Sequence, residues 1–113
     1  MHEMAICESI IGIIEEQASR NNYHKVKTVF LEIGKLAGVE IAALEFGFEV
    51  VAKNTIAEGA RLDITEPAAA AWCLNCSRQV EVTNRYDSCP NCGSYQLQIN
   101  GGDKLRIKEL EVE

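Results

Sequence analysis

The sequence predicts an α+β protein: a small mixed three-stranded sheet with two helices, interrupted by an inserted ribbon of short strands. Segments of helical and of alternating periodicity follow one another from residue 4 to residue 65. Four of the five cysteines then occur as Cys73-x-x-Cys76, twelve residues, and Cys89-x-x-Cys92. Two such knuckles close a tetrahedron around Zn²⁺, so the insertion is predicted to be a four-cysteine zinc ribbon.

Residues 4–20 are predicted to form the first helix, because apolar residues recur there at spacings of three and four. The stripe consists of Met4, Cys7, Ile11, Ile14 and Ala18. Since Cys7 lies on this stripe, we expect a small core residue and not a ligand or redox thiol. Asn21 and Asn22 are expected to end the helix.

Residues 26–33 are predicted to form a strand with apolar residues on both faces. Val26 and Phe30 lie on one face, and Val29 and Leu31 lie on the other. A strand with two apolar faces is covered on both sides or lies centrally in its sheet. We therefore expect this strand to be covered on both faces, or at least to be a central one.

Gly34 and Gly38 bracket the turn that follows. Helical spacing returns over residues 40–53, and residues 60–65 then alternate as a strand that ends at Pro67. The second apolar stripe consists of Ile41, Leu44, Phe48 and Val51. A helix between two strands predicts the crossover connection of a βαβ unit.

Residues 68–102 contain the paired cysteines and many turn residues, and residues 104–112 alternate again as a strand. The last strand is expected to return to the first sheet. This organisation predicts an α/β domain of residues 1–66 and 103–113 and a zinc-ribbon domain of residues 67–102.

The four-cysteine motif favours structural zinc, while two disulfides or a rubredoxin-like iron site remain alternatives. Pro90 fixes its own φ, and Gly93 can adopt the positive φ that a knuckle needs. A shell of four thiolates leaves no open metal position and therefore brings no catalysis with it. The sequence contains no phosphate-binding glycine loop or further histidine cluster, so we expect no enzyme.

Composition excludes further classes of function. The formal net charge of −6 argues against nucleic acid, which is bound by basic surfaces. No run of about 18 apolar residues is present, so we expect no membrane span. Met1-His2-Glu3 is not the start of a signal peptide, and paired Cys-x-x-Cys motifs fit a reducing compartment. A cytoplasmic location is expected.

The N-terminus is a candidate for a second metal site. The Met1 amine, the His2 amide nitrogen and the His2 imidazole can form adjoining chelate rings, and the Glu3 amide nitrogen can complete a square plane. Square-planar nitrogen coordination is typical of Ni(II) or Cu(II), and residue types do not choose between them. His24 lies in a polar turn, where an exposed loop histidine is expected.

Several motifs together resemble the HypA/HybF family of nickel chaperones for hydrogenase maturation. They are Met1-His2-Glu3, Leu31-Glu32-Ile33-Gly34, Val39-Glu40, Phe46-x-Phe48-Glu49, Glu58-Gly59-Ala60-x-Leu62, Trp72-Cys73-x-x-Cys76 and Cys89-Pro90-x-Cys92-Gly93. The resemblance covers the whole chain. The cysteine pattern is shared with many zinc ribbons, but its combination with this N-terminus is far more specific.

The resemblance implies Ni(II) bound at the N-terminus through His2 and neighbouring backbone nitrogens, with Glu3 as part of that site, and structural zinc in the ribbon. It also implies two partners, a HypB-type nickel GTPase and the hydrogenase large subunit. Some members carry histidines beside the zinc module, but this chain has Ser77 and Ser94 there. Glu40 is a candidate outer ligand or partner contact, and a carboxylate at the start of a helix is the more ordinary interpretation.

The predicted function is a nickel metallochaperone that binds Ni(II) at its N-terminus and delivers it for hydrogenase maturation. The alternatives are a zinc-ribbon protein-interaction module without nickel transfer and an iron-containing electron carrier.

Overall fold

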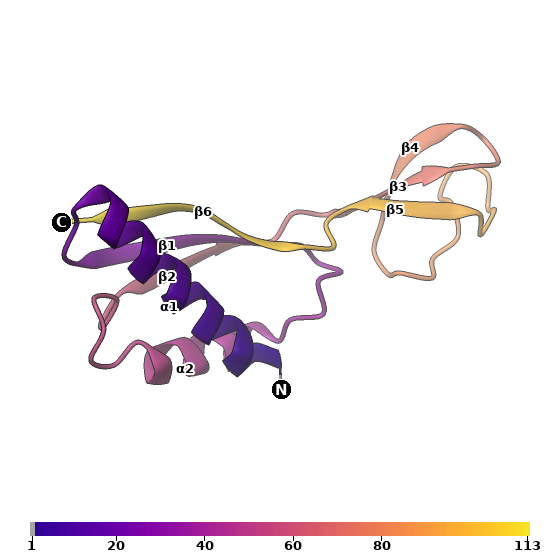
Figure 1. Cartoon of the computed structure of the whole chain (residues 1–113). Helices are drawn as coiled ribbons and strands as arrows, with labels where there is room; N and C mark the ends of the chain where they lie inside the picture. The colour runs from indigo at the N-terminus through magenta and orange to yellow at the C-terminus, as the bar shows by residue number, and fades with distance from the viewer. Residues whose placement is uncertain (1) are drawn as a thin grey trace. The chain divides into compact units, whose positions relative to one another are not determined.

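The computed structural model describes the backbone of residues 2–113 and the side chains of residues 3–113. The elements are α1 (His2–Asn21), β1 (Val26–Ile33), α2 (Ile41–Val51), β2 (Arg61–Thr65), β3 (Ala69–Cys73), β4 (Arg78–Val82), β5 (Leu97–Gly101) and β6 (Leu105–Val112) (Figure 1). The strands form two three-stranded sheets with the orders β2-β1-β6 and β4-β3-β5. The predicted α+β class with two helices is confirmed.

The main elements agree with the sequence prediction, and their ends differ for physical reasons. β1 is the central strand of its sheet, as its two apolar faces predicted, and β6 returns to it. α1 begins at His2, two residues before the predicted start, and stops beside Asn22, which has a φ of 58°. α2 begins at Ile41, one residue after the predicted start, because the extended Glu40 caps it and its carboxylate accepts from the Ala42 N–H at 3.0 Å; α2 ends at Val51, before the predicted residue 53.

The chain divides into two compact units. The helical unit comprises Met1–Leu31, Val39–Ile64 and Ile107–Glu113, and the cysteine unit comprises Glu32–Gly38 and Thr65–Arg106. The division falls within β1 and β6, so one end of each strand belongs to the cysteine unit. The domain boundaries expected from the sequence stay a prediction about which segments fold independently.

The core of the helical unit lies where α1 and α2 pack side by side (Figure 1). Cys7 is fully buried there, as predicted, and its thiol donates to the Leu44 carbonyl oxygen at 3.3 Å. A methyl group on Gly47 would lie 2.8 Å from Met4 Sδ and 3.3 Å from Cys7 Sγ. Glycine at this position therefore lets the two helices approach closely. Among the described residues, no helix is both long and apolar enough to cross a bilayer.

In the cysteine unit, β3 pairs antiparallel with both β4 and β5. Its core holds buried Ala69, Ala71 and Val82, with Leu36 packed against them. The turn of residues 34–38 is fastened to this unit, because the Leu36 N–H donates to the Gly102 carbonyl oxygen at 2.8 Å. A methyl group on Gly34 would lie 2.1 Å from the Gly102 carbonyl carbon, so only glycine fits this crossing.

Candidate metal centre

The two cysteine pairs lie on neighbouring turns of the cysteine unit. Cys73 ends β3, and Cys76 lies in the turn of the β3–β4 hairpin. The second pair belongs to the loop between β4 and β5, where the Cys89 N–H donates to the Ser94 carbonyl oxygen at 2.7 Å. The topology therefore brings together two pairs that twelve residues separate in the chain.

The two knuckles share one backbone geometry. The Ser77 N–H donates to the Cys73 carbonyl oxygen at 2.9 Å, and the Gly93 N–H donates to the Cys89 carbonyl oxygen at 2.8 Å. Gly93 has a φ of 79°, as the sequence predicted. Ser77 has a φ of 53° at the equivalent position of the first knuckle, and no feature of the sequence predicted it. A serine in this left-handed region costs more than a glycine does.

The four sulfurs are arranged as a metal site. Cys73 Sγ lies 3.6 Å from Cys92 Sγ, and Cys76 Sγ lies 3.8 Å from Cys89 Sγ. All four atoms lie within 4.8 Å of one another. A Zn–S bond of about 2.3 Å in tetrahedral geometry requires sulfur–sulfur distances of about 3.8 Å. The donor set and its spacing therefore fit Zn²⁺, and no cysteine forms a disulfide.

Amide groups donate to these sulfurs and favour their thiolate forms. Cys89 Sγ accepts from the N–H groups of Asn91 and Cys92 at 3.3 and 3.4 Å. Asn75 Nδ2 donates to Cys92 Sγ at 3.4 Å, and this side-chain amide is the largest cause that lowers the pKa of Cys92 to about 6. The two asparagines were not identified from the sequence as site residues, although they occupy the variable positions of the knuckles.

The proton distribution over the four thiols is uneven. Asn91 Nδ2 donates to Cys76 Sγ at 3.5 Å and lowers the pKa of this thiol, but burial and the neighbouring thiols outweigh it and raise the pKa to about 11. Burial raises the pKa of Cys89. The N–H groups of Cys92 and Asn91 together outweigh burial, so the pKa of Cys89 is lowered. A bound metal ion replaces the remaining thiol protons. The affinity of the site for the metal therefore decreases as pH is lowered.

The predicted N-terminal site is described only in part. Met1 and the side chain of His2 lie outside the described residues, whereas Glu3 is 8% exposed. Glu3 Oε2 accepts from the Glu40 N–H at 3.0 Å, and this bond is the largest cause that lowers the pKa of Glu3 to about 2. Glu3 therefore stands as a carboxylate that links the start of α1 to the cap of α2.

Two other sequence candidates have ordinary structural roles. The Glu40 carboxylate is the N-cap of α2, which is the more ordinary of the two interpretations considered for this residue. His24 is exposed in the loop between α1 and β1, as expected. Within residues 3–113, only the four paired cysteines form a cluster of metal-binding side chains.

Comparison with known proteins covers the whole chain. Residues 1–112 match the family model "HypA: Hydrogenase/urease nickel incorporation, metallochaperone, hypA". Curated relatives named hydrogenase maturation factor HypA include those of Alkalilimnicola ehrlichii and Bradyrhizobium sp., 56% and 57% identical over 113 residues, with 100% of both chains covered.

Two solved structures of HypA proteins are also similar to this chain. The solution structure of the Ni metallochaperone HypA from Helicobacter pylori is 27% identical, with a TM-score of 0.71 over 99% of this chain and 97% of that one. A second solution structure of HypA protein is 28% identical, with a TM-score of 0.75 over 100% of this chain and 97% of that one.

Proposed function

The chain belongs to the HypA family of nickel-incorporation metallochaperones, and we propose that this protein binds Ni(II) at its N-terminus and delivers the ion for maturation of nickel–iron hydrogenase. Members of this family are not enzymes. The proposed ligands are the Met1 amine, the His2 amide and imidazole nitrogens, and the Glu3 amide nitrogen. The family binds zinc at the four-cysteine site and carries nickel as cargo. The observation that carries the N-terminal assignment is the position of Glu3.

Glu3 supports the proposal through its place in the fold. α1 begins at His2, so the proposed amide ligands fall in the first helical turn, where N–H groups are not part of the internal hydrogen-bond ladder. The Glu3 carboxylate is held by the Glu40 N–H at 3.0 Å. Glu3 thus serves as a positioning residue that fixes the α1 end of the site while the terminal amine and imidazole close on the metal.

We assign zinc to Cys73, Cys76, Cys89 and Cys92. The ion supplies folding free energy to the cysteine unit and leaves no open position for nickel. Asn75 and Asn91 orient the sulfurs from outside the ligand shell and favour their charged forms. The ribbon therefore acts as a scaffold, and nickel transfer is carried by the other unit.

We further propose that the protein works in the cytoplasm with a HypB-type nickel GTPase and the hydrogenase large subunit, and without nucleic acid or membrane. The acidic balance of the chain supports protein partners over nucleic acid. Maturation of a hydrogenase requires that nickel reach its large subunit, so a donor must bind nickel reversibly.

The testing experiment is an Ni(II) titration of zinc-loaded, tag-free protein with its native Met1, followed by calorimetry and absorbance. We expect one tightly bound ion with a yellow, square-planar spectrum. His2→Ala and an extension by one residue before Met1 should both abolish it, whereas His24→Ala, the matched loop control, should not. Binding that survives both changes at the N-terminus would place nickel elsewhere. Absence of nickel binding would favour a zinc-ribbon interaction module.

Nickel affinity should also decrease as pH is lowered, because the amine, imidazole and amide ligands must lose protons to bind. We expect proton release on binding and sharp weakening below about pH 6. The titration repeated at pH 5.5 and pH 7.5 checks this. Equal affinities at the two values would contradict coordination by these nitrogen ligands.

A further inference from the structure

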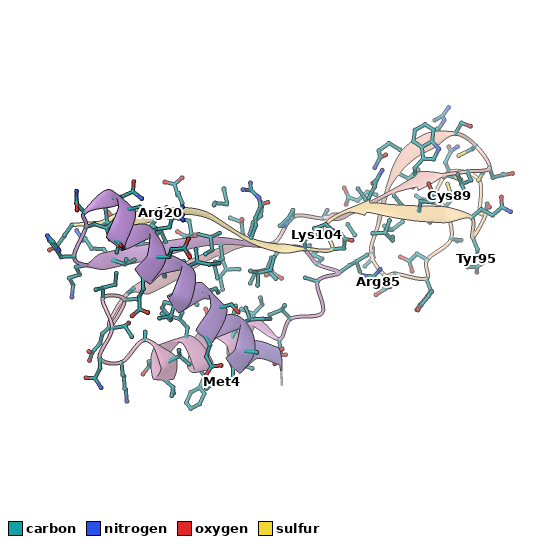
Figure 2. All side chains as sticks on the ribbon, in the orientation of Figure 1. Met4, Arg20, Arg85, Cys89, Tyr95 and Lys104 are labelled. Carbon is teal, nitrogen blue, oxygen red and sulfur yellow. The ribbon has the colours of Figure 1, made fainter. Side chains whose placement is uncertain are left out.

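The outward side of α2 exposes apolar side chains that a folded monomer ordinarily buries. Phe46 is 69% exposed and Val50 is 43% exposed, and their spacing of four places both on one helix face. Ala42, one turn earlier on that face, is also exposed. Met4 lies against Gly47 on the side toward α1, and it is 41% exposed (Figure 2). These residues form one apolar stripe on the helical unit.

Acidic residues border this stripe. Glu45 and Glu49 are exposed, follow one another at a spacing of four, and lie on the side of the stripe opposite Met4. Both also line a hollow of about 410 Å³ between α2 and β2, with apolar Phe48, Ala52 and Leu62 and with Arg61. The hollow therefore offers an apolar lining beside two carboxylates and one guanidinium.

The charge of the molecule is concentrated in the same unit. The helical unit contains twelve acidic and six basic residues, whereas the cysteine unit contains five of each. The formal net charge of −6 therefore belongs to the helical unit alone. A basic partner is drawn to this unit, and an anionic membrane is repelled from it.

We propose that the α2 surface, formed by Met4, Phe46 and Val50 with Glu45 and Glu49, docks a partner protein that presents a large apolar side chain beside a lysine or arginine. The apolar side chain packs on Phe46, and aromatic and methionine side chains are enriched in protein interfaces. The basic side chain lays its aliphatic stem along the apolar lining of the hollow and its charge beside the two carboxylates.

A second copy of this chain fits the surface poorly. A twofold dimer would bring together two helical units that each have a formal net charge of −6, which like charges oppose. The docking also involves none of the proposed nickel ligands. It should therefore occur without nickel, so its failure is separable from a failure of the N-terminal site.

The probe is a helix-forming 15-residue peptide with a leucine stripe bordered by lysines, titrated into the zinc-loaded full chain and followed by amide NMR. We expect shift changes confined to α2, the first turns of α1 and β2. Phe46→Ser, or Glu45→Gln with Glu49→Gln, should weaken binding at least about tenfold. The matched controls are Ile13→Ser, which removes another exposed apolar residue, and Glu15→Gln with Glu16→Gln, which removes the same charge further along α1.

A second peptide, in which glutamates replace the lysines, tests the charge requirement. It should bind at least about tenfold more weakly than the lysine peptide. Equal binding of the two peptides, equal losses in the control variants, or shift changes centred on the cysteine unit would each overturn the proposal. Dimerisation of the chain that Phe46→Ser abolishes in sedimentation velocity would overturn the choice of a basic partner in favour of a second copy.

Discussion

The two units of this chain are stabilised in different ways. Buried leucine, isoleucine, valine and phenylalanine side chains from both helices and the sheet fill the helical unit; examples are Ile10, Ile14, Leu31, Leu44 and Phe48. In the described part of the cysteine unit, the buried apolar residues are Ile33, Ala69, Ala71 and Val82, with Cys73 and Cys89 of the metal site. Alanines bury little apolar surface, so the second unit depends far more on its metal.

One short chain therefore combines two sources of folding free energy, apolar burial in one unit and metal binding in the other. Each unit also has its own spectroscopic reporter. Trp72, the single tryptophan, precedes Cys73 in β3, and it is 38% exposed. Both helices belong to the helical unit. Tryptophan emission therefore follows the cysteine unit, and circular dichroism at 222 nm follows the helical unit.

Removal of zinc should give the largest difference between the responses of the two units. Structural zinc supplies about 10–16 kcal/mol of apparent binding free energy in small zinc domains. A chelator should change Trp72 emission and leave the helical signal at 222 nm in place, and added zinc should restore the emission. Loss of the helical signal together with the emission change would contradict the separation.

Two cysteine variants provide the matched control for zinc removal. Cys73→Ser removes a buried metal ligand, whereas Cys7→Ala removes a buried thiol from the helical core. Only Cys73→Ser should lower the zinc content of the purified protein. Equal zinc loss in both variants would count against the assigned ligand set.

A core substitution in the helical unit should give the opposite result. Leu44 is fully buried on α2, and its carbonyl oxygen accepts from the Cys7 thiol. Leu44→Ala leaves a cavity that typically costs about 2–5 kcal/mol of unfolding free energy. In urea, the 222 nm transition should move to lower concentration while zinc content and Trp72 emission persist. Ala43→Gly, an exposed neighbour on the same helix, should cost only about 1 kcal/mol.

Periodicity and spacing predicted most of this fold, because they record local and chemical constraints. The two apolar faces of β1 predicted its central place, and the paired cysteines predicted the four-sulfur cluster. Contacts between distant segments leave no such pattern. The packing of Leu36 on the ribbon core and the bond from the Glu40 N–H to Glu3 both join residues more than thirty positions apart. The turn of residues 34–38 belongs to the cysteine unit, and no local pattern in a sequence reports where a turn packs.

Loss of the hydrogen bond between Glu3 and Glu40 should have a smaller effect on stability than zinc removal or Leu44→Ala. It reports on the start of α1. The pKa of Glu3 is about 2 in the folded chain and 4.5 without this environment. Because the folded pKa is the lower one, the carboxylate stabilises the helical unit fully above about pH 4.5, and this contribution is lost as pH falls toward about 2. Acid also protonates the thiolates, but that loss belongs to the cysteine unit.

Glu3→Gln keeps an oxygen that can accept from the Glu40 N–H, removes the negative charge and replaces the second acceptor oxygen by an amide donor. Nickel-free variant and parent should therefore differ in urea midpoint at 222 nm near pH 7, and the difference should shrink as pH falls from 5 to 3. Glu8→Gln, exposed further along α1, should show no such convergence. Equal urea midpoints of variant and parent across this range would mean that the hydrogen bond from the Glu40 N–H, and not the charge of Glu3, holds α1 to the cap of α2. In that case a neutral residue could position the N-terminus equally well, and the carboxylate would need another role in the nickel site.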